Sequence, residues 1–275
     1  MFLLNGESRH CVDVSDRGFQ YGDGLFETIA VYKGRPLFLQ RHLDRLLKGC
    51  RRLRIPPPDL SLLESEARQL SAAADQAVLK LMVTRGSGGR GYRQPDQIVP
   101  TRLLSLHPSP KYPERYQTDG IVARFCEWRL AINPGLAGIK HMNRLEQILA
   151  RAEWQDETVQ EGLMFDNDDR IVEGTMSNLF FVKEGVLHTP LLIDCGIEGI
   201  LRQIVIEFAI RNSLGLSENH FNKQNVLEAD EVFVTNSVIG IWPVKQLENQ
   251  CFGVGRITRD IQQWYAAARE QETNL

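Results

Sequence analysis

Residues 25–54 read LFETIAVYKGRPLFLQRHLDRLLKGCRRLR and contain the clearest indication of fold in the chain. Residues 25–32 are rich in β-branched and aromatic side chains, which is typical of a strand. Turn residues at 33–36 precede apolar residues at 37–39, so we expect a β-hairpin. From about Gln40 to Arg54, leucines recur at helical spacing between basic residues, which predicts an amphipathic helix. Hairpins and helices of this kind on a mainly antiparallel sheet favour the α+β class.

The segments that follow divide the chain in two. We expect a second helix at about 59–74 and β-rich runs at 77–84 and 101–106. The next segment, 108–120, is polar and Pro-rich and has no hydrophobic periodicity, so it predicts a linker. The predicted organisation is an N-terminal α+β domain at 1–110, a linker at 111–120 and a C-terminal domain at 121–275.

Short strand-like runs dominate the C-terminal part, at 121–129, 162–165, 178–182, 186–189, 231–234 and 239–244. Helices are expected at about 143–156, 200–211 and 258–269, and the first of these carries Leu145, Ile148, Leu149 and Ala152 on one stripe. Many short strands and few helices predict a barrel-like core with helices around it.

Composition excludes several classes of protein. The chain of 275 residues is 43% hydrophobic and 24% charged, which is ordinary for a globular protein and excludes general disorder. A net charge of −3 argues against a nucleic-acid binder. We expect no membrane segment, because no apolar run approaches about 20 residues, and the N-terminus does not resemble a signal peptide. The five scattered cysteines form no CxxC pair, which predicts neither disulfides nor a metal site and favours buried thiols in the cytoplasm.

Two charged residues stand in contexts that suit chemistry. Lys140 follows the uncharged run 130–139; burial would lower its pKa and leave a neutral amine for Schiff-base chemistry. Glu173 precedes a glycine and small polar residues, in a pattern that suits a turn beside a ligand. Read singly, each residue has an ordinary alternative: a lysine that reaches water at a helix start and an exposed loop glutamate.

Anion-binding groups occur at several further positions. Gly199-Ile200-Leu201 opens a helix, whose amides attract phosphate, and Thr235-Asn236-Ser237 follows a strand with hydroxyls and amides. Arg85 and Arg90 flank a flexible glycine-rich loop, and arginine binds carboxylates in bidentate fashion; a mobile loop with solubilising charges is the alternative. Arg45, among the charges of its helix, is by pattern alone a solvated residue.

Five stretches together resemble the fold-type IV pyridoxal-phosphate enzymes, which include the branched-chain and D-amino-acid aminotransferases. They are SDRGFQYGDG (15–24), HLDRL (42–46), RGSGGRGY (85–92), IKHMNRLEQ (139–147) and VEGTMSNL (172–179). The fourth, taken with RGSGGRGY, resembles the aminodeoxychorismate lyase branch. Branched-chain transaminases commonly place a tyrosine shortly after the lysine, whereas this chain has Asn143 and Leu145, which also argues against a transaminase.

The resemblance implies a role for each matching residue. Lys140 would bind pyridoxal 5'-phosphate covalently, Glu173 would contact the pyridine nitrogen, and Thr28 would lie near the cofactor and assist the lysine. The residues implied for the cofactor phosphate are Arg45, Ile200, Leu201 and Ser237. Charge alone suggests Arg85 or Arg90 for a substrate carboxylate.

The resemblance also implies a two-domain chain that works as a homodimer. The expected reaction is the conversion of 4-amino-4-deoxychorismate, a small-molecule substrate, to 4-aminobenzoate and pyruvate. A D-amino-acid or branched-chain aminotransferase on the same fold is the first alternative, and it would require a 2-oxo acid. A small-ligand binding protein without catalysis is the second.

Overall fold

The computed structural model describes residues 1–274 and divides the chain into two compact units. Unit 1 contains Met1–Pro110, Ile139–Asn143 and the C-terminal residues from Gln271, and unit 2 contains Lys111–Gly138 and Arg144–Glu270. This division differs from the predicted domains in three places, since the predicted linker at 111–120 belongs to unit 2 and the residues from Gln271 belong to unit 1. The segment with Lys140, which was expected in the C-terminal domain, also belongs to unit 1.

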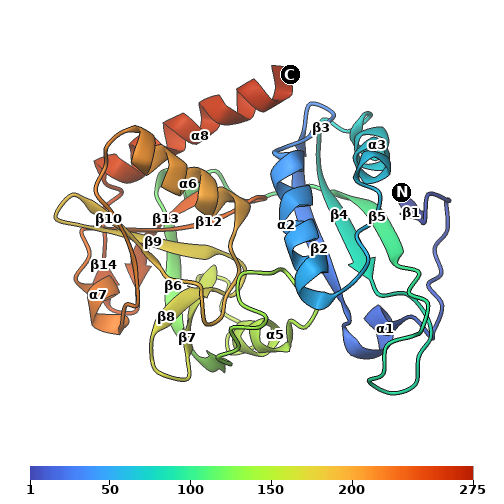
Figure 1. Ribbon diagram of the computed structural model, residues 1–275. Coiled ribbons are helices and arrows are strands. Elements are labelled where there is room, and N and C mark those ends of the chain that lie inside the picture. Colours follow the sequence, from blue (N-terminus) through green and yellow to red (C-terminus); the bar gives the residue numbers. More distant parts are fainter. Residues whose placement is uncertain (275) are drawn as a thin grey trace. The chain divides into compact units, whose positions relative to one another are not determined.

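Unit 1 is built on a five-stranded antiparallel sheet in the order β1-β5-β4-β2-β3 (Figure 1). Its strands are β1 (Phe2–Leu4), β2 (Gly24–Tyr32), β3 (Arg35–Pro36), β4 (Gln76–Thr84) and β5 (Thr101–Pro108). Its helices are α1 (Arg17–Tyr21), α2 (Leu39–Leu53) and α3 (Leu60–Ser71).

The packing of α2 on β2 follows from the two periodicities of the sequence. Alternate residues of β2, such as Leu25 and Ile29, are buried, and α2 buries Leu43 and Leu46. Each such side chain contributes about 2 kcal/mol to the free energy of folding. The strand predicted at 37–39 is not formed, because the backbone at Phe38 turns into the left-handed region, with φ of 52°, and passes directly into α2.

Unit 2 is built on a closed barrel. Strands β9, β12, β13, β6, β7 and β8 are hydrogen-bonded in that order, and the pairing of β8 with β9 closes the ring. The strands are β6 (Ile121–Leu130), β7 (Glu161–Asp166), β8 (Ile171–Gly174), β9 (Asn178–Lys183), β12 (Glu231–Asn236) and β13 (Gly240–Leu247). Strands β10 (Val186–Pro190), β11 (Leu216–Asn219) and β14 (Gln250–Cys251) extend the sheet. This confirms the predicted α+β class and barrel-like core.

Helices α4 (Arg115–Thr118), α5 (Leu145–Arg151), α6 (Ile200–Arg211), α7 (Lys223–Leu227) and α8 (Arg256–Asn274) complete the fold. The main apolar cluster of unit 2 contains Phe125, Phe165 and Trp242 and is drawn from both ends of the unit's sequence. The predicted linker packs within unit 2, since the rings of Tyr112 and Tyr116 lie 4.8 and 5.2 Å from that of Trp242.

Helix α5 differs from its prediction in length and in the face that it buries. It ends at Arg151, and its apolar stripe is exposed, with Leu145 at 71%, Ile148 at 59% and Leu149 at 42%. The opposite face, with Ala150, is buried against a cluster that includes Trp154. The apolar periodicity correctly predicted which residues share a helix face, but it does not show whether that face is buried within the chain.

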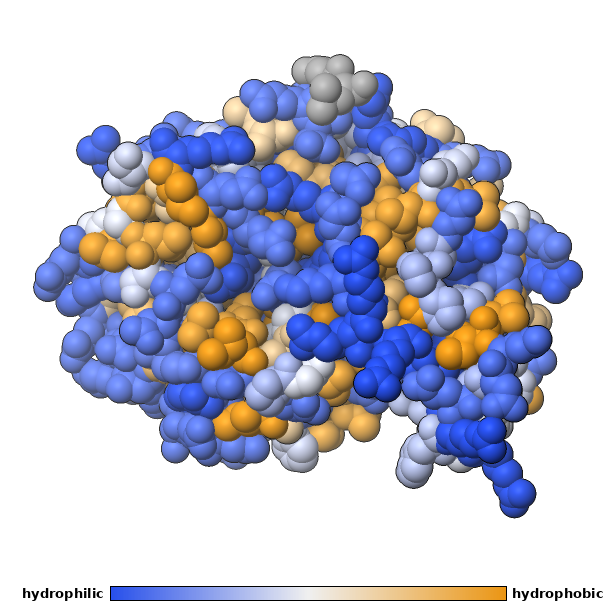
Figure 2. Space-filling model, in the orientation of Figure 1, coloured by the Kyte–Doolittle hydropathy of each residue, from blue (hydrophilic) through white to orange (hydrophobic). Residues whose placement is uncertain are grey.

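Three further features concern the cysteines, the length of the helices and clusters of metal-binding residue types. Cys50, Cys126 and Cys195 are buried free thiols, and burial raises their pKa values to about 11, 12 and 12, whereas Cys11 and Cys251 are exposed, contrary to the expectation of burial. Within residues 1–274, no helix has the length and apolar character to cross a membrane. The same residues contain no cluster of three His, Cys, Asp or Glu side chains that would hold a metal ion. On the face shown in Figure 2, apolar residues form separate patches in a mainly hydrophilic surface.

Candidate active site

Lys140 lies in an extended segment beside β2 and not at a helix start. The Phe26 N–H donates to the Lys140 carbonyl at 3.0 Å, and the Met142 N–H donates to the Gly24 carbonyl at 2.9 Å. These bonds fix the half-buried lysine, and its Nζ lies 4.5 Å from the centroid of the Phe26 ring. Gly24 is required here, because a Cβ would lie 2.7 Å from both the Val83 carbonyl oxygen and the Met142 sulfur.

Thr28 lies two residues beyond Phe26 in β2, so the two side chains project from the same face of the sheet. Both are half-buried, and Thr28 is paired with Lys80 of β4. Unit 1 therefore places a hydroxyl on the strand face that carries the Phe26 ring, next to which the Lys140 amine lies.

The opposite face of β2 carries a buried ionic cluster. Arg45 of α2 donates from Nε to Glu27 Oε1 at 2.8 Å and from Nη2 to Oε2 at 2.5 Å, and His42 Nδ1 lies 2.6 Å from Oε2. Burial raises the pKa of Glu27, but the Arg45 charge and the His42 hydrogen bond outweigh it and lower the pKa to about 2. Burial lowers the pKa of His42, and because the ionised Glu27 carboxylate can only accept, His42 donates from Nδ1. Arg45 is 8% exposed, and its interpretation as a solvated helix residue is wrong.

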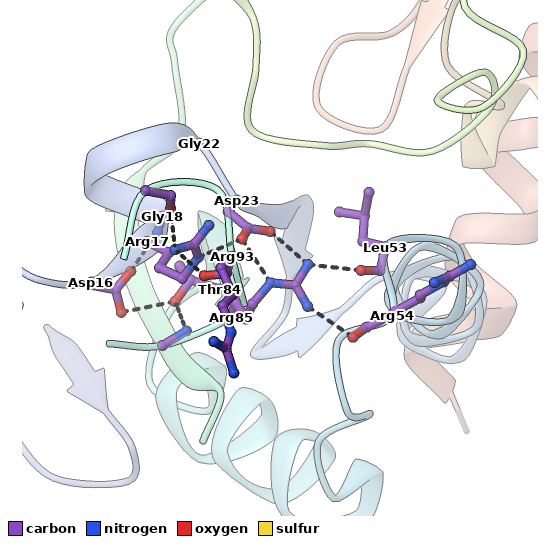
Figure 3. A network of polar contacts seen from close by, with 12 residues as sticks. Asp16, Arg17, Gly18, Gly22, Asp23, Leu53, Arg54, Thr84, Arg85 and Arg93 are labelled. Carbon is purple, nitrogen blue, oxygen red and sulfur yellow. Dashed lines mark hydrogen bonds and ion pairs between the residues drawn. The ribbon is translucent and has the colours of Figure 1, made fainter. Parts of the chain in front are cut away.

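Arg85 is part of the scaffold of unit 1 (Figure 3). It donates from Nε and Nη2 to the two carboxylate oxygens of Asp23 at 2.7 and 2.9 Å. Its Nη1 donates to the Arg54 carbonyl at 2.9 Å and its Nη2 to the Leu53 carbonyl at 2.8 Å, which ties the end of α2 to the turn before β2. Arg17 donates to the same carboxylate at 3.0 Å. All three nitrogens of Arg85 therefore have protein acceptors, which argues against a substrate role, whereas Arg90 is exposed.

In unit 2, Glu173 is a buried residue of β8 and not an exposed loop glutamate. It is 3% exposed, and its Oε2 accepts from the Ile197 N–H at 2.9 Å and from Asn178 Nδ2 at 3.4 Å. Asn178 also donates to the Ile197 carbonyl at 2.8 Å. Burial lowers the pKa of the Arg144 guanidinium, while the Glu173 charge raises it. The contacts of Asn178 and Ile197 with Glu173 were not predicted.

The two predicted phosphate segments are also in unit 2. Gly199 precedes α6 with no side-chain cap among the described residues, so the first amides of the helix, including those of Ile200 and Leu201, point outward from its N-terminus. Thr235 is fully buried, and its hydroxyl has no hydrogen-bond partner among residues 1–274. Ser237 is half-buried in the loop that follows. Buried polar groups normally have partners, so the Thr235 hydroxyl is a candidate contact for a ligand.

Comparisons with known proteins agree on one family. Residues 24–247 match the model of the amino-transferase class IV family. The chain is 35% identical to the aminodeoxychorismate lyase of Vibrio harveyi over 95% of this chain and 98% of that protein. It is 31% identical to the D-alanine aminotransferase of Bacillus licheniformis over 94% of each chain. The crystal structure of 4-amino-4-deoxychorismate lyase from Pseudomonas aeruginosa superposes with a TM-score of 0.94, at 46% identity, over 97% of this chain and 98% of that chain.

Proposed function

Because the chain belongs to the class IV aminotransferase family, we propose that it is a pyridoxal-phosphate-dependent lyase that converts 4-amino-4-deoxychorismate to 4-aminobenzoate and pyruvate. The observation that carries this choice is the 46% identity to a 4-amino-4-deoxychorismate lyase over nearly all of both chains. A D-amino-acid aminotransferase is the second candidate, supported by 31% identity over 94% of each chain.

The described residues fit pyridoxal 5'-phosphate. Lys140 offers an amine on a backbone segment that is hydrogen-bonded to β2, and Glu173 is a buried carboxylate with one oxygen that accepts from an N–H. The uncapped N-terminus of α6 and the orphaned Thr235 hydroxyl offer donors that suit a phosphate. When bound, the cofactor supplies an electron sink at the amine-bearing carbon of the substrate.

The chain's own groups then have separate tasks. Lys140 Nζ holds the cofactor and afterwards accepts the proton from the amine-bearing carbon. The carboxylate of Glu173 holds a proton at the pyridine nitrogen, so that the ring remains able to accept electrons. Loss of the enolpyruvyl group makes the substrate ring aromatic, and Lys140 with the Thr28 hydroxyl delivers a proton to the departing pyruvate.

The phosphate and the substrate carboxylate need cationic or donor groups. We assign the phosphate to the amides of Ile200 and Leu201, the hydroxyl of Ser237 and the guanidinium of Arg45, which Glu27 orients. For the carboxylate we keep Arg90, since the nitrogens of Arg85 already donate to protein acceptors.

We further propose a homodimer that works in the cytoplasm. The exposed stripe of α5, with Leu145 at 71% and Ile148 at 59%, is a surface that a second copy of the chain would cover. The buried free thiols of Cys50, Cys126 and Cys195 suit a reducing compartment.

The homodimer is tested at the exposed stripe of α5. The variant Ile148→Glu is expected to shift the mass in sedimentation equilibrium to that of a monomer. Ile210→Glu, at an isoleucine of α6 that is 66% exposed, is the matched control.

The reaction itself is tested with 4-amino-4-deoxychorismate in the absence of any 2-oxo acid. We expect equal amounts of pyruvate and 4-aminobenzoate from the wild type and neither above background from Lys140→Ala, because the amine that moves the proton is missing. A transaminase would instead require an amino acid and a 2-oxo acid and would release no 4-aminobenzoate. Wild-type rates in Lys140→Ala would disprove the mechanism.

A further inference from the structure

Glu161 is a fully buried carboxylate that no sequence motif singled out. It opens β7 and is 0% exposed. Its Oε1 accepts from the backbone N–H of Gly162 at 2.9 Å and from both the N–H and the hydroxyl of Thr175, at 3.0 and 2.6 Å. Its Oε2 accepts from the Ser177 hydroxyl at 2.6 Å and from the Met176 N–H at 3.4 Å. These partners are neutral donors, and four of the five come from the turn at 175–177.

This turn joins Glu173 to Asn178, one of the two residues that donate to the Glu173 carboxylate; the other is Ile197. Glu173 and Gly174 precede it, and Asn178, whose amide donates to Glu173, follows it directly. The turn is tight, since the Gly174 N–H donates to the Ser177 carbonyl at 2.6 Å. A Cβ on Gly174 would lie 2.7 Å from Glu161 Oε2 and 2.4 Å from the Ser177 hydroxyl, so the carboxylate fills the space against this backbone.

We propose that Glu161 is a positioning residue for the contact between Glu173 and the pyridine nitrogen. By accepting from Thr175, Met176 and Ser177 it sets the turn, and through the turn it sets both Glu173 and the Asn178 amide that holds it. The inference rests on the proposed function, because it requires that Glu173 faces the cofactor ring.

A buried glutamate that only stabilises the fold is the rival explanation, and the chain contains a matched control for it. Glu231, which is 8% exposed, opens β12 and accepts from the Ile257 N–H and from the N–H and hydroxyl of Thr258. The donors of Glu231 belong to the start of α8, and the donors of Glu161 belong to the turn that carries Glu173.

The experiment compares two ligands in three full-length proteins: wild type, Glu161→Gln and Glu231→Gln. The ligands are pyridoxal 5'-phosphate and its analogue with carbon in place of the ring nitrogen, and the readout is the dissociation constant from tryptophan fluorescence. Glutamine keeps the shape of the side chain but replaces one acceptor oxygen by a donor. We expect Glu161→Gln to raise the dissociation constant of pyridoxal 5'-phosphate by about tenfold. The dissociation constant of the nitrogen-free analogue should be the same for Glu161→Gln and for the wild type. Glu231→Gln is expected to change neither constant.

The proposal would be overturned if Glu161→Gln bound both ligands more weakly by the same factor, or bound both as tightly as the wild type does. If the substitution prevents folding, Ser177→Ala removes a single donor to Oε2 and is expected to show the same ligand selectivity at a smaller fold-change. A wild type that binds neither ligand overturns the proposed function and this inference with it, whereas a wild type that binds both while Glu161→Gln shows no selectivity overturns only the inference.

Discussion

Two buried glutamates, one in each unit, are accommodated in opposite ways. Glu27 in unit 1 lies against a guanidinium and an imidazole, and its pKa is lowered to about 2. Glu161 in unit 2 has neutral donors, and there burial raises the pKa although the hydroxyls of Ser177 and Thr175 lower it. The two side chains are 1% and 0% exposed, so the difference lies in the partners and not in the depth of burial.

The comparison separates two uses of a buried carboxylate. The Glu27 charge is needed to neutralise and orient a second charge, that of Arg45, which lies on an apolar helix face. The Glu161 carboxylate is needed as an acceptor that organises backbone, in the way that a capping residue does. A buried ion pair is expensive to break because one charge remains, whereas a neutral network loses only hydrogen bonds.

The largest expected effect is that of Glu27→Ala, which leaves Arg45 buried without this carboxylate. We expect the free energy of unfolding to fall by about 3–5 kcal/mol, measured by urea denaturation. The control is Glu64→Ala, which breaks the exposed Glu64–Arg68 pair on α3 and is expected to cost less than about 1 kcal/mol. Equal losses of unfolding free energy in the two variants would show that the buried pair is no more expensive to break than the exposed one.

The dependence of stability on pH is expected to have opposite signs for the two glutamates. A pKa lowered from 4.5 to about 2 means that the Glu27 contribution is complete above pH 4.5 and is lost as the pH falls toward 2. The difference in unfolding free energy between wild type and Glu27→Gln should therefore grow by about 3 kcal/mol as the pH rises from about 2 to 4.5. Glu161 has a raised pKa, so the folded chain binds its proton more tightly and its contribution decreases as the pH rises above the ordinary value of 4.5.

Urea denaturation of wild type, Glu27→Gln and Glu161→Gln over a series of pH values measures both slopes. Two difference curves that rise together with pH would show that Glu161 is also stabilised in its charged form.

Asp23 tests an intermediate case, because it pairs with Arg17 and Arg85 but its side chain is 17% exposed. Burial raises its pKa, and the hydrogen bonds and charges of Arg85 and Arg17 outweigh burial and lower it. We expect Asp23→Asn to cost about 2 kcal/mol in unfolding free energy, less than Glu27→Ala, because water screens part of the interaction. A loss as large as that of Glu27→Ala would show that partial exposure does not weaken such a pair here.

The smallest effect is expected at Thr235, a buried hydroxyl without a partner in the described chain. Thr235→Val replaces it by a methyl group of similar volume and should stabilise the cofactor-free protein by about 1 kcal/mol in thermal unfolding. If the hydroxyl serves the phosphate, the same variant binds pyridoxal 5'-phosphate more weakly but binds pyridoxal, which lacks the phosphate, as the wild type does. Destabilisation of the cofactor-free protein would mean that the hydroxyl has a partner there.

Elements with a strong local signal could be predicted from the sequence. Helix α6 begins and ends at the expected residues, Ile200 and Arg211, and Asp59 caps α3 by accepting from the N–H groups of Ser61 and Leu62. Both depend on contacts within a few residues, which pattern and capping rules describe. Closure of the barrel depends on β-strand pairs such as β6 with β13, which are far apart in the sequence, and only its general form could be predicted.

Site residues could be predicted where the residue type is unusual among its sequence neighbours. They could not be predicted where partners distant in the sequence decide the role of the residue. Lys140 and Glu173 stand out in the chain, but the burial of Arg45 and the acceptors of Arg85 depend on distant partners. Glu161 had no signal beyond a single acid at the start of an apolar strand. Four of its five donors lie 14 to 16 residues away, and only the folded turn shows them.

The barrel closes through a short contact. Strand β8 meets β9 in one register pair, Glu173 opposite Asn178, while β12 meets β9 in a run of five. Opening of that pair would break the ring and free the edge of β8 at Glu173, which could then serve as a template for strand addition by another chain. Substitutions at Glu173 or Asn178 should therefore be followed by light scattering, since self-association would accompany any loss of catalysis.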